Sequence, residues 1–177
     1  AHRFIRGYNS PAMPILDSHT IEFFSRSPEQ TRRIGMRLGS ELKTGDVICL
    51  QGNLGAGKTT FVQGLAQGWG SIDAVSSPTF IIVNEYRRAT GGLIFHLDAY
   101  RLESMPEAEE LDLDAMLSEG VVIIEWPEKL NGLIPNDRLW ITLEHIQEEQ
   151  RQMSFKAHGK RYDDLLDGIR QSMFGGA

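Results

Sequence analysis

A glycine-rich loop with one lysine is the feature that most constrains this chain. Residues 52–59 read GNLGAGKT and match the pattern G-x-x-x-x-G-K-[ST] in full. A short apolar run over 46–51 precedes the loop, and a helical pattern follows it, with apolar residues at Phe61, Val62, Leu65, Ala66 and Trp69. Glycines let successive backbone N–H groups converge on phosphate oxygens, and the following helix adds its positive dipole end. The pattern therefore predicts a strand, a phosphate-binding loop and a helix, in that order.

This motif, a P-loop, assigns individual roles in binding ATP and Mg²⁺. Lys58 is expected to reach the β and γ phosphates, and the hydroxyl of Thr59 to ligate the magnesium ion. A glycine-rich turn with a surface lysine is the alternative, which the agreement of the flanking segments disfavours. The residues expected to contact the nucleotide are Gly52, Asn53, Leu54, Gly55, Ala56, Gly57, Lys58, Thr59 and Thr60.

A P-loop also needs an acidic side chain near the metal, at the end of a nearby apolar strand. Asp98 ends the segment LIFHLD, and Glu125 ends the segment VVIIE. Both are expected at carboxyl ends of strands, where ligands bind in open α/β sheets. Together they predict a metal and water site, although a solvated strand-end carboxylate is the alternative for each. His96 should share the face of Asp98 and is interpreted as a packed or hydrogen-bonded structural histidine.

The remaining segments predict an α/β fold: a P-loop NTPase-like sandwich with a mixed, mainly parallel central sheet and a C-terminal antiparallel hairpin. Ser27 and Gln30 are spaced as a capping box at the start of the first helix, as are Ser104 and Glu107 before a later one. The expected strands are 15–24, 46–51, 78–88, 93–98, 121–124, 139–143 and 153–157. The expected helices follow Ser27, follow the P-loop, cover 106–117 and include 165–169.

Length and composition favour one ATPase domain over 13–177, in a chain of 177 residues. Residues 1–12 are predicted to be a disordered extension or to precede an alternative start at Met13. The formal net charge of -6 argues against a protein that grips DNA or RNA through phosphate contacts. No apolar stretch approaches the roughly 18 residues that a membrane span needs. The single cysteine, Cys49, lies in an apolar run and suggests a buried thiol in a cytoplasmic protein.

Four ordered motifs together are more specific than the P-loop alone. GNLGAGKTT, SSPTF, HLDAYRL and IEWPEKL followed by LIP resemble the TsaE family, also called YjeE, over roughly 15–155. The resemblance implies a small bacterial Mg²⁺-dependent ATPase, needed for the N6-threonylcarbamoyl modification of adenosine 37 (t6A37) in tRNAs that read codons beginning with A. It also implies two protein partners, TsaB and TsaD, of which TsaD performs the transfer onto tRNA. Contact with tRNA would then be only indirect.

The resemblance also implies residue roles. Lys58 and Thr59 become the phosphate and Mg²⁺ residues, Glu125 the Walker-B-like metal ligand, and Asp98 the carboxylate needed for hydrolysis. Thr79 would lie in a switch-like loop, and Trp126 would stand beside the nucleotide. For Trp126 a static packing role is the alternative, because large aromatic side chains usually serve cores.

Other classes of P-loop protein remain open from the residues. A small-molecule kinase would also carry such a loop, but little sequence between the P-loop helix and Asp98 is left for a lid. A GTPase is disfavoured because no N-K-x-D segment is present to read guanine. A nucleotide-gated binding module, whose slow hydrolysis only resets its protein partners, overlaps with the family interpretation.

Overall fold

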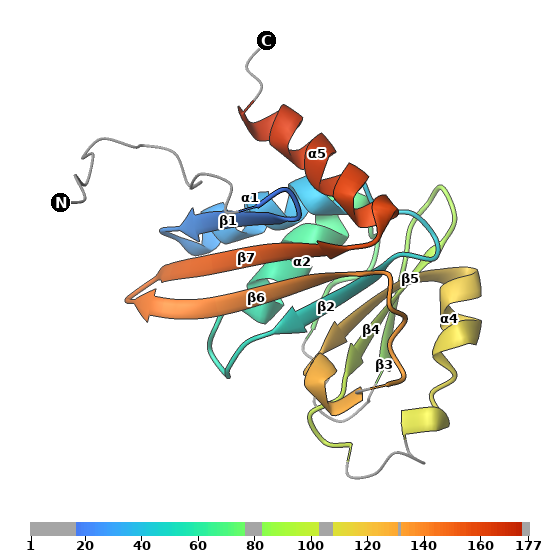
Figure 1. Ribbon diagram of the computed structural model, residues 1–177. Coiled ribbons are helices and arrows are strands. Elements are labelled where there is room, and N and C mark those ends of the chain that lie inside the picture. The colour runs from blue at the N-terminus through green and yellow to red at the C-terminus, as the bar shows by residue number, and fades with distance from the viewer. Residues whose placement is uncertain (1–16, 77–82, 103–107, 131, 175–177) are drawn as a thin grey trace, which may run out of the picture.

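The computed structural model describes residues 17–76, 83–102, 108–130 and 132–174. Within these ranges seven strands form one sheet in the order β1-β7-β6-β2-β5-β4-β3 (Figure 1). The strands are β1 (Thr20–Ser25), β2 (Val47–Gln51), β3 (Val83–Arg87), β4 (Leu93–Asp98), β5 (Gly120–Glu125), β6 (Arg138–Gln147) and β7 (Gln150–His158). The helices are α1 (Pro28–Gly39), α2 (Lys58–Trp69), α4 (Leu113–Glu119), α5 (Lys160–Phe174) and the short 3₁₀ turn η1 (Pro127–Leu130).

The sheet is mixed, and its centre is parallel. The strands β6, β2, β5 and β4 lie next to one another and run in the same direction. The antiparallel pairs lie toward the two edges: β3 beside β4, and β7 between β6 and β1. The predicted α/β class, the mainly parallel centre and the C-terminal hairpin of β6 and β7 are thereby confirmed.

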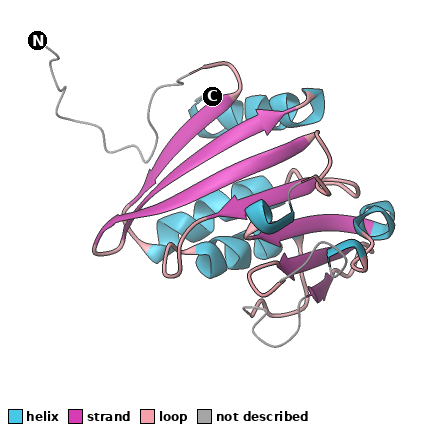
Figure 2. Cartoon of the chain, turned by 60° about the horizontal axis from the view of Figure 1, so that its bottom comes forward, coloured by secondary structure: helices cyan, strands magenta, loops and turns pink. Residues whose placement is uncertain are grey.

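The sheet is buried on both faces, which explains the continuous apolar runs in β2 and β5. Ile48 and Leu50 belong to a core shared with α1, α2 and α5. Val47 and Cys49 belong to a second core, shared with α4 and η1. Helices lie on both sides of the sheet (Figure 2). Burial raises the pKa of the Cys49 thiol to about 12, so this side chain acts as a small apolar residue and not as a reactive thiol.

Helix α1 begins as its sequence predicts. The Oγ of Ser27 accepts a hydrogen bond of 3.2 Å from the N–H of Gln30. The side-chain Oε1 of Gln30 accepts from the N–H of Arg26 at 2.7 Å, one residue before the expected Ser27. The two bonds still satisfy two backbone donors at the helix start, as a capping box does.

Helices α1 and α2 cross at backbone contact, which only glycine allows. A Cβ atom added at Gly39 would lie 2.0 Å from the carbonyl oxygen of Leu65, and one added at Gly64 would lie 2.1 Å from that of Arg32. A Cβ atom added at Gly68 would likewise lie 2.1 Å from the carbonyl oxygen of Met36. This close crossing holds α2, the helix that follows the glycine loop, against α1.

Two predicted elements differ from the structure in their boundaries. The first strand begins at Thr20, not at residue 15, which lies outside the described ranges. The helix predicted over 106–117 is interrupted: residues 108–109 are helical, residues 110–112 are not, and α4 starts at Leu113. Its N-cap is Asp112, whose left-handed backbone (φ 50°) ends a turn and whose carboxylate accepts from the N–H of Ala115. The proposed cap at Ser104 and Glu107, residues 1–12 and the first part of the strand predicted over 78–88 also lie outside the described ranges.

Among the described residues, no helix combines the length and the apolar character needed to cross a membrane.

Candidate functional site

The glycine loop joins the carboxyl end of β2 to the first residue of α2. Gly55 and Gly57 adopt left-handed backbone angles, with φ of 80° and 100°, which glycine accepts without strain. Gly52 is needed for a different reason, because a Cβ there would lie 2.8 Å from the carbonyl oxygen of Leu143 in β6. Gly57 is the N-cap of α2 and offers no side-chain oxygen to the helix. The N–H groups of the first turn are thus left for an anion.

Lys58, the first residue of α2, turns its side chain back to the loop and is almost fully buried. Its Nζ donates a hydrogen bond of 2.6 Å to the carbonyl oxygen of Gly52. The same ammonium lies 4.2 Å from the ring centroid of Trp126. Burial lowers the pKa of Lys58, and the carboxylates of Glu125 and Asp98 act in the opposite direction. The lysine therefore sits between the loop and the Trp126 ring, within electrostatic reach of two acidic side chains.

The two predicted carboxylates are brought side by side. Asp98 and Glu125 are register partners at the carboxyl ends of the parallel strands β4 and β5. Burial is the main factor that raises the pKa of Asp98, and the charge of Glu125 adds to it. The N–H of Tyr100, which donates to Asp98 Oδ1 at 2.9 Å, lowers that pKa in part. Glu125 is only 4% exposed, so it needs a polar partner in the protein.

The partner of Glu125 is His96, which is fully buried. His96 Nε2 lies 2.7 Å from Glu125 Oε2, and His96 Nδ1 lies 2.8 Å from the hydroxyl of Tyr86. The hydrogen-bonded histidine predicted at this position is thus present. Tyr86 is a residue that the sequence interpretation missed, because its side chain meets His96 diagonally across the β3–β4 pair and no local pattern marks that contact.

Trp126 follows Glu125 directly and has an unusual backbone. Its φ is 58°, in the left-handed region that bulky residues rarely adopt, at a cost of about 1–3 kcal/mol. The ring of Trp126 also contacts Tyr100, with 4.8 Å between ring centroids. With this backbone turn the indole lies over the Lys58 ammonium.

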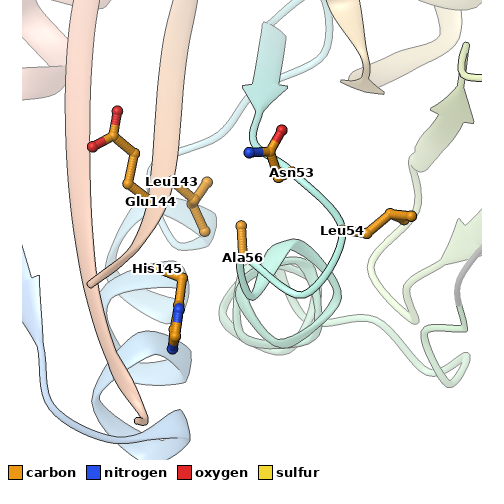
Figure 3. A pocket seen from close by; sticks show the side chains of 6 residues that line it. All are labelled: Asn53, Leu54, Ala56, Leu143, Glu144 and His145. Atoms are coloured by element: carbon orange, nitrogen blue, oxygen red, sulfur yellow. The ribbon is translucent and has the colours of Figure 1, made fainter. Parts of the chain in front are cut away.

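A cavity of about 480 Å³ opens on the other side of the loop. It is lined by Asn53, Leu54, Ala56, Leu143, Glu144 and His145 (Figure 3). Because β2 lies between β6 and β5 in the sheet, this cavity and the carboxylates Asp98 and Glu125 flank the loop on opposite sides. Arg151 of β7 was also missed by the sequence interpretation. Its Nη2 donates to the carbonyl oxygen of Gly55 at 3.2 Å.

The residues around the loop fit a magnesium ion held with a nucleotide. Among the described residues no group of three or more His, Cys, Asp or Glu side chains could hold a metal by itself. Magnesium in nucleotide sites is bound by one or two protein oxygens, with phosphates and waters completing the octahedron. The Thr59 hydroxyl in the first turn of α2 and the carboxylate of Glu125 have that chemistry. Thr79, the predicted switch residue, lies outside the described residues.

The fold and the loop together define the class: a P-loop-type nucleotide-binding protein. A model of the family described as threonylcarbamoyl adenosine biosynthesis protein TsaE matches residues 25–153. The chain belongs to the TsaE family.

Relatives and a solved structure agree with that assignment. The tRNA threonylcarbamoyladenosine biosynthesis protein TsaE of Bacillus subtilis is 39% identical over 144 residues, which are 81% of this chain and 89% of that protein. The protein of the same name from Synechocystis is 42% identical over 124 residues, covering 67% of this chain and 77% of the relative. The crystal structure of YdiB from Bacillus subtilis superposes with a TM-score of 0.73 at 30% identity, covering 86% of this chain and 95% of that one.

Proposed function

We propose that this protein is a Mg²⁺-dependent ATPase that acts in the t6A37 modification of tRNA. Two kinds of evidence, from relatives and from the structure, support the proposal. Relatives that are 39% identical to this chain bear the name of that biosynthesis. The observation that carries the ATPase assignment is the buried Lys58, enclosed by the glycine loop, Trp126 and the adjacent carboxylates.

In the proposed site each protein group has a separate task. The loop N–H groups and Lys58 hold the β and γ phosphates. These phosphates then replace the Gly52 carbonyl and the Trp126 ring as partners of the Lys58 ammonium. Magnesium, when bound, neutralises charge on the phosphate oxygens. Thr59 and Glu125 are the residues that would hold it.

Asp98 is the group proposed to act on water. A water molecule attacks the γ-phosphorus, the bond to the β-phosphate oxygen breaks, and ADP leaves with phosphate as the second product. The carboxylate of Asp98 orients this water and accepts its proton. The raised pKa of Asp98 suits that task, because a stronger base holds the proton better.

The two carboxylates should be separable by substitution. We expect Glu125→Gln to weaken ATP binding about 10- to 100-fold when Mg²⁺ is present and to change it little in EDTA, because a metal ligand is lost. Asp98→Asn should bind Mg²⁺ and ATP normally and lose about 100-fold or more in hydrolysis, because the proton acceptor is gone. Calorimetry with ATP in Mg²⁺ and in EDTA, together with phosphate release, measures both.

A matched control is Asp114→Asn, which neutralises an exposed carboxylate in the first turn of α4. It should leave binding and hydrolysis at the parent values. The reverse pattern, with Asp98→Asn losing Mg²⁺-dependent binding and Glu125→Gln losing only hydrolysis, would exchange the two assignments.

We further propose that hydrolysis switches a complex with TsaB and TsaD in the cytoplasm, with tRNA contacted only through these partners. Trp126 motivates this step, because the ammonium that lies 4.2 Å from its ring must turn toward phosphate when ATP binds. The isolated protein is expected to turn over slowly and the partners to raise its rate, since a switch requires different affinities for two states of the complex.

Trp126 fluorescence tests the proposed switch. We expect the emission to shift when Mg²⁺ and ATP are added, because a cation leaves the ring face. The chain has three tryptophans, so the spectrum of Trp126→Phe must be subtracted to remove Trp69 and Trp140. An unchanged Trp126 signal, together with a hydrolysis rate that TsaB and TsaD do not alter, would contradict coupling through this site.

A reconstitution tests the biological role. The protein is added to TsaB, TsaD, tRNA and threonylcarbamoyl-adenylate, and t6A is counted over several turnovers. Sustained modification with the parent and not with Asp98→Asn supports the proposal. A phosphorylated small-molecule acceptor in place of free phosphate would instead identify a kinase.

A further inference from the structure

A chain of buried polar side chains leads away from the candidate metal carboxylate into the apolar core. It runs from Glu125 through His96 to Tyr86, and the Tyr86 hydroxyl lies 3.2 Å from the carbonyl oxygen of Ser76. His96 is fully buried, Tyr86 is 2% exposed, and both lie on the sheet face that α2 covers. A buried polar group costs free energy unless it is hydrogen-bonded, so packing alone does not explain why these three polar side chains stand in the core.

The hydrogen-bond directions follow from the chemistry of the groups. An ionised Glu125 can only accept, so His96 donates to it from Nε2. The Tyr86 hydroxyl carries one hydrogen, which it donates to the Ser76 carbonyl, and its oxygen lies 2.8 Å from His96 Nδ1. The Ser76 carbonyl also accepts from the Nδ2 of Asn84, at 3.2 Å. The position of each side chain in this series therefore depends on the next.

We propose that His96 and Tyr86 are positioning residues for the metal carboxylate: His96 holds one oxygen of Glu125 so that the other faces the loop, and Tyr86 holds the His96 ring. This inference rests on the proposed Mg²⁺–ATP function. A carboxylate at the end of a strand has two free side-chain torsions before its planar group. A donor fixed at 2.7 Å removes that freedom before the metal arrives.

Two substitutions of His96 separate positioning from packing. The side-chain nitrogen of glutamine reaches about as far as Nε2, so His96→Gln keeps a donor for Glu125. The amide of asparagine reaches only as far as Nδ1, so His96→Asn retains a partner for Tyr86 and leaves Glu125 without one. We expect the Mg²⁺ concentration that half-saturates ATP binding to rise about 10- to 100-fold in His96→Asn and to stay within about threefold of the parent in His96→Gln.

Tyr86→Phe gives a second, gentler test. It removes one hydroxyl and keeps the ring, and it should raise the half-saturating Mg²⁺ concentration about fivefold, the effect of one ordinary hydrogen bond. Its matched control is Tyr162→Phe in α5. Tyr162 is also buried, and its hydroxyl accepts from the N–H of Val47, at the opposite end of β2 from the loop. The control should lose stability and leave the response to Mg²⁺ unchanged.

The outcomes distinguish the inference from the function on which it rests. Calorimetry measures ATP affinity against Mg²⁺ concentration and in EDTA, and urea unfolding measures the stability of each variant. A parent that binds ATP equally with and without Mg²⁺ would overturn both. A normal parent response, with His96→Asn and Tyr86→Phe both unchanged, would overturn only the positioning role. Should His96→Asn fail to fold, the comparison of Tyr86→Phe with Tyr162→Phe decides the question.

Discussion

Replacing Lys58 by methionine should lower the rate of ATP hydrolysis by about 100- to 1,000-fold, the loss expected for one preorganised charge that meets the transition state. Methionine retains an unbranched stem to pack under Trp126 and removes only the ammonium. The carbonyl of Gly52 loses its donor, but it lies in the loop, where water can replace the lysine. Phosphate release at saturating Mg²⁺ and ATP measures the effect.

The control is Lys160→Met, in which an ammonium is removed from an exposed side chain at the start of α5. Its activity should equal that of the parent. Circular dichroism should show both variants folded. A Lys58→Met protein that hydrolyses ATP at the parent rate would exclude this loop as the site of phosphate binding.

Substituting Gly64 by alanine should lower the free energy of unfolding by about 2 kcal/mol. The new methyl group would lie 2.1 Å from the carbonyl oxygen of Arg32, and the backbone there cannot rotate away as a side chain could. Forcing α1 and α2 apart costs about 3 kcal/mol, and the better helix propensity of alanine recovers about 1 kcal/mol. The midpoint of urea unfolding measures the net change.

Gly168→Ala is the matched control, because it makes the same substitution inside α5. No atom lies within 4 Å of the position that its Cβ would take. Only the propensity gain remains, so Gly168→Ala should raise the free energy of unfolding by about 0.5–1 kcal/mol. Equal effects at the two glycines would mean that the crossing of α1 and α2 is looser than the structure has it.

Much of the fold could be predicted because its signals are local. The alternation at Leu139, Ile141 and Leu143 marks a strand with one polar side, and Ser27 marks the start of α1 through a bond to a residue three positions away. The glycine loop is equally local, since its backbone angles depend on the glycines themselves. Segments of this kind are predicted well because their geometry depends on neighbours in the chain.

Boundaries set by tertiary packing were predicted less well. The helix predicted over 106–117 is broken before α4, which begins after Asp112, whose left-handed backbone no sequence pattern indicated. The left-handed turn at Trp126 was equally hidden, because it costs free energy locally and persists only where the surrounding structure enforces it.

The sequence by itself determined the class of site: a loop for phosphate, a lysine within it, and two acidic residues at the ends of apolar strands. Only the tertiary structure decided how these groups are held. The bond between His96 and Glu125 joins residues 29 positions apart, and that between Arg151 and Gly55 joins residues 96 positions apart. Such contacts depend on strand order and register, which arise from burying both faces of the sheet together, and no local pattern encodes them.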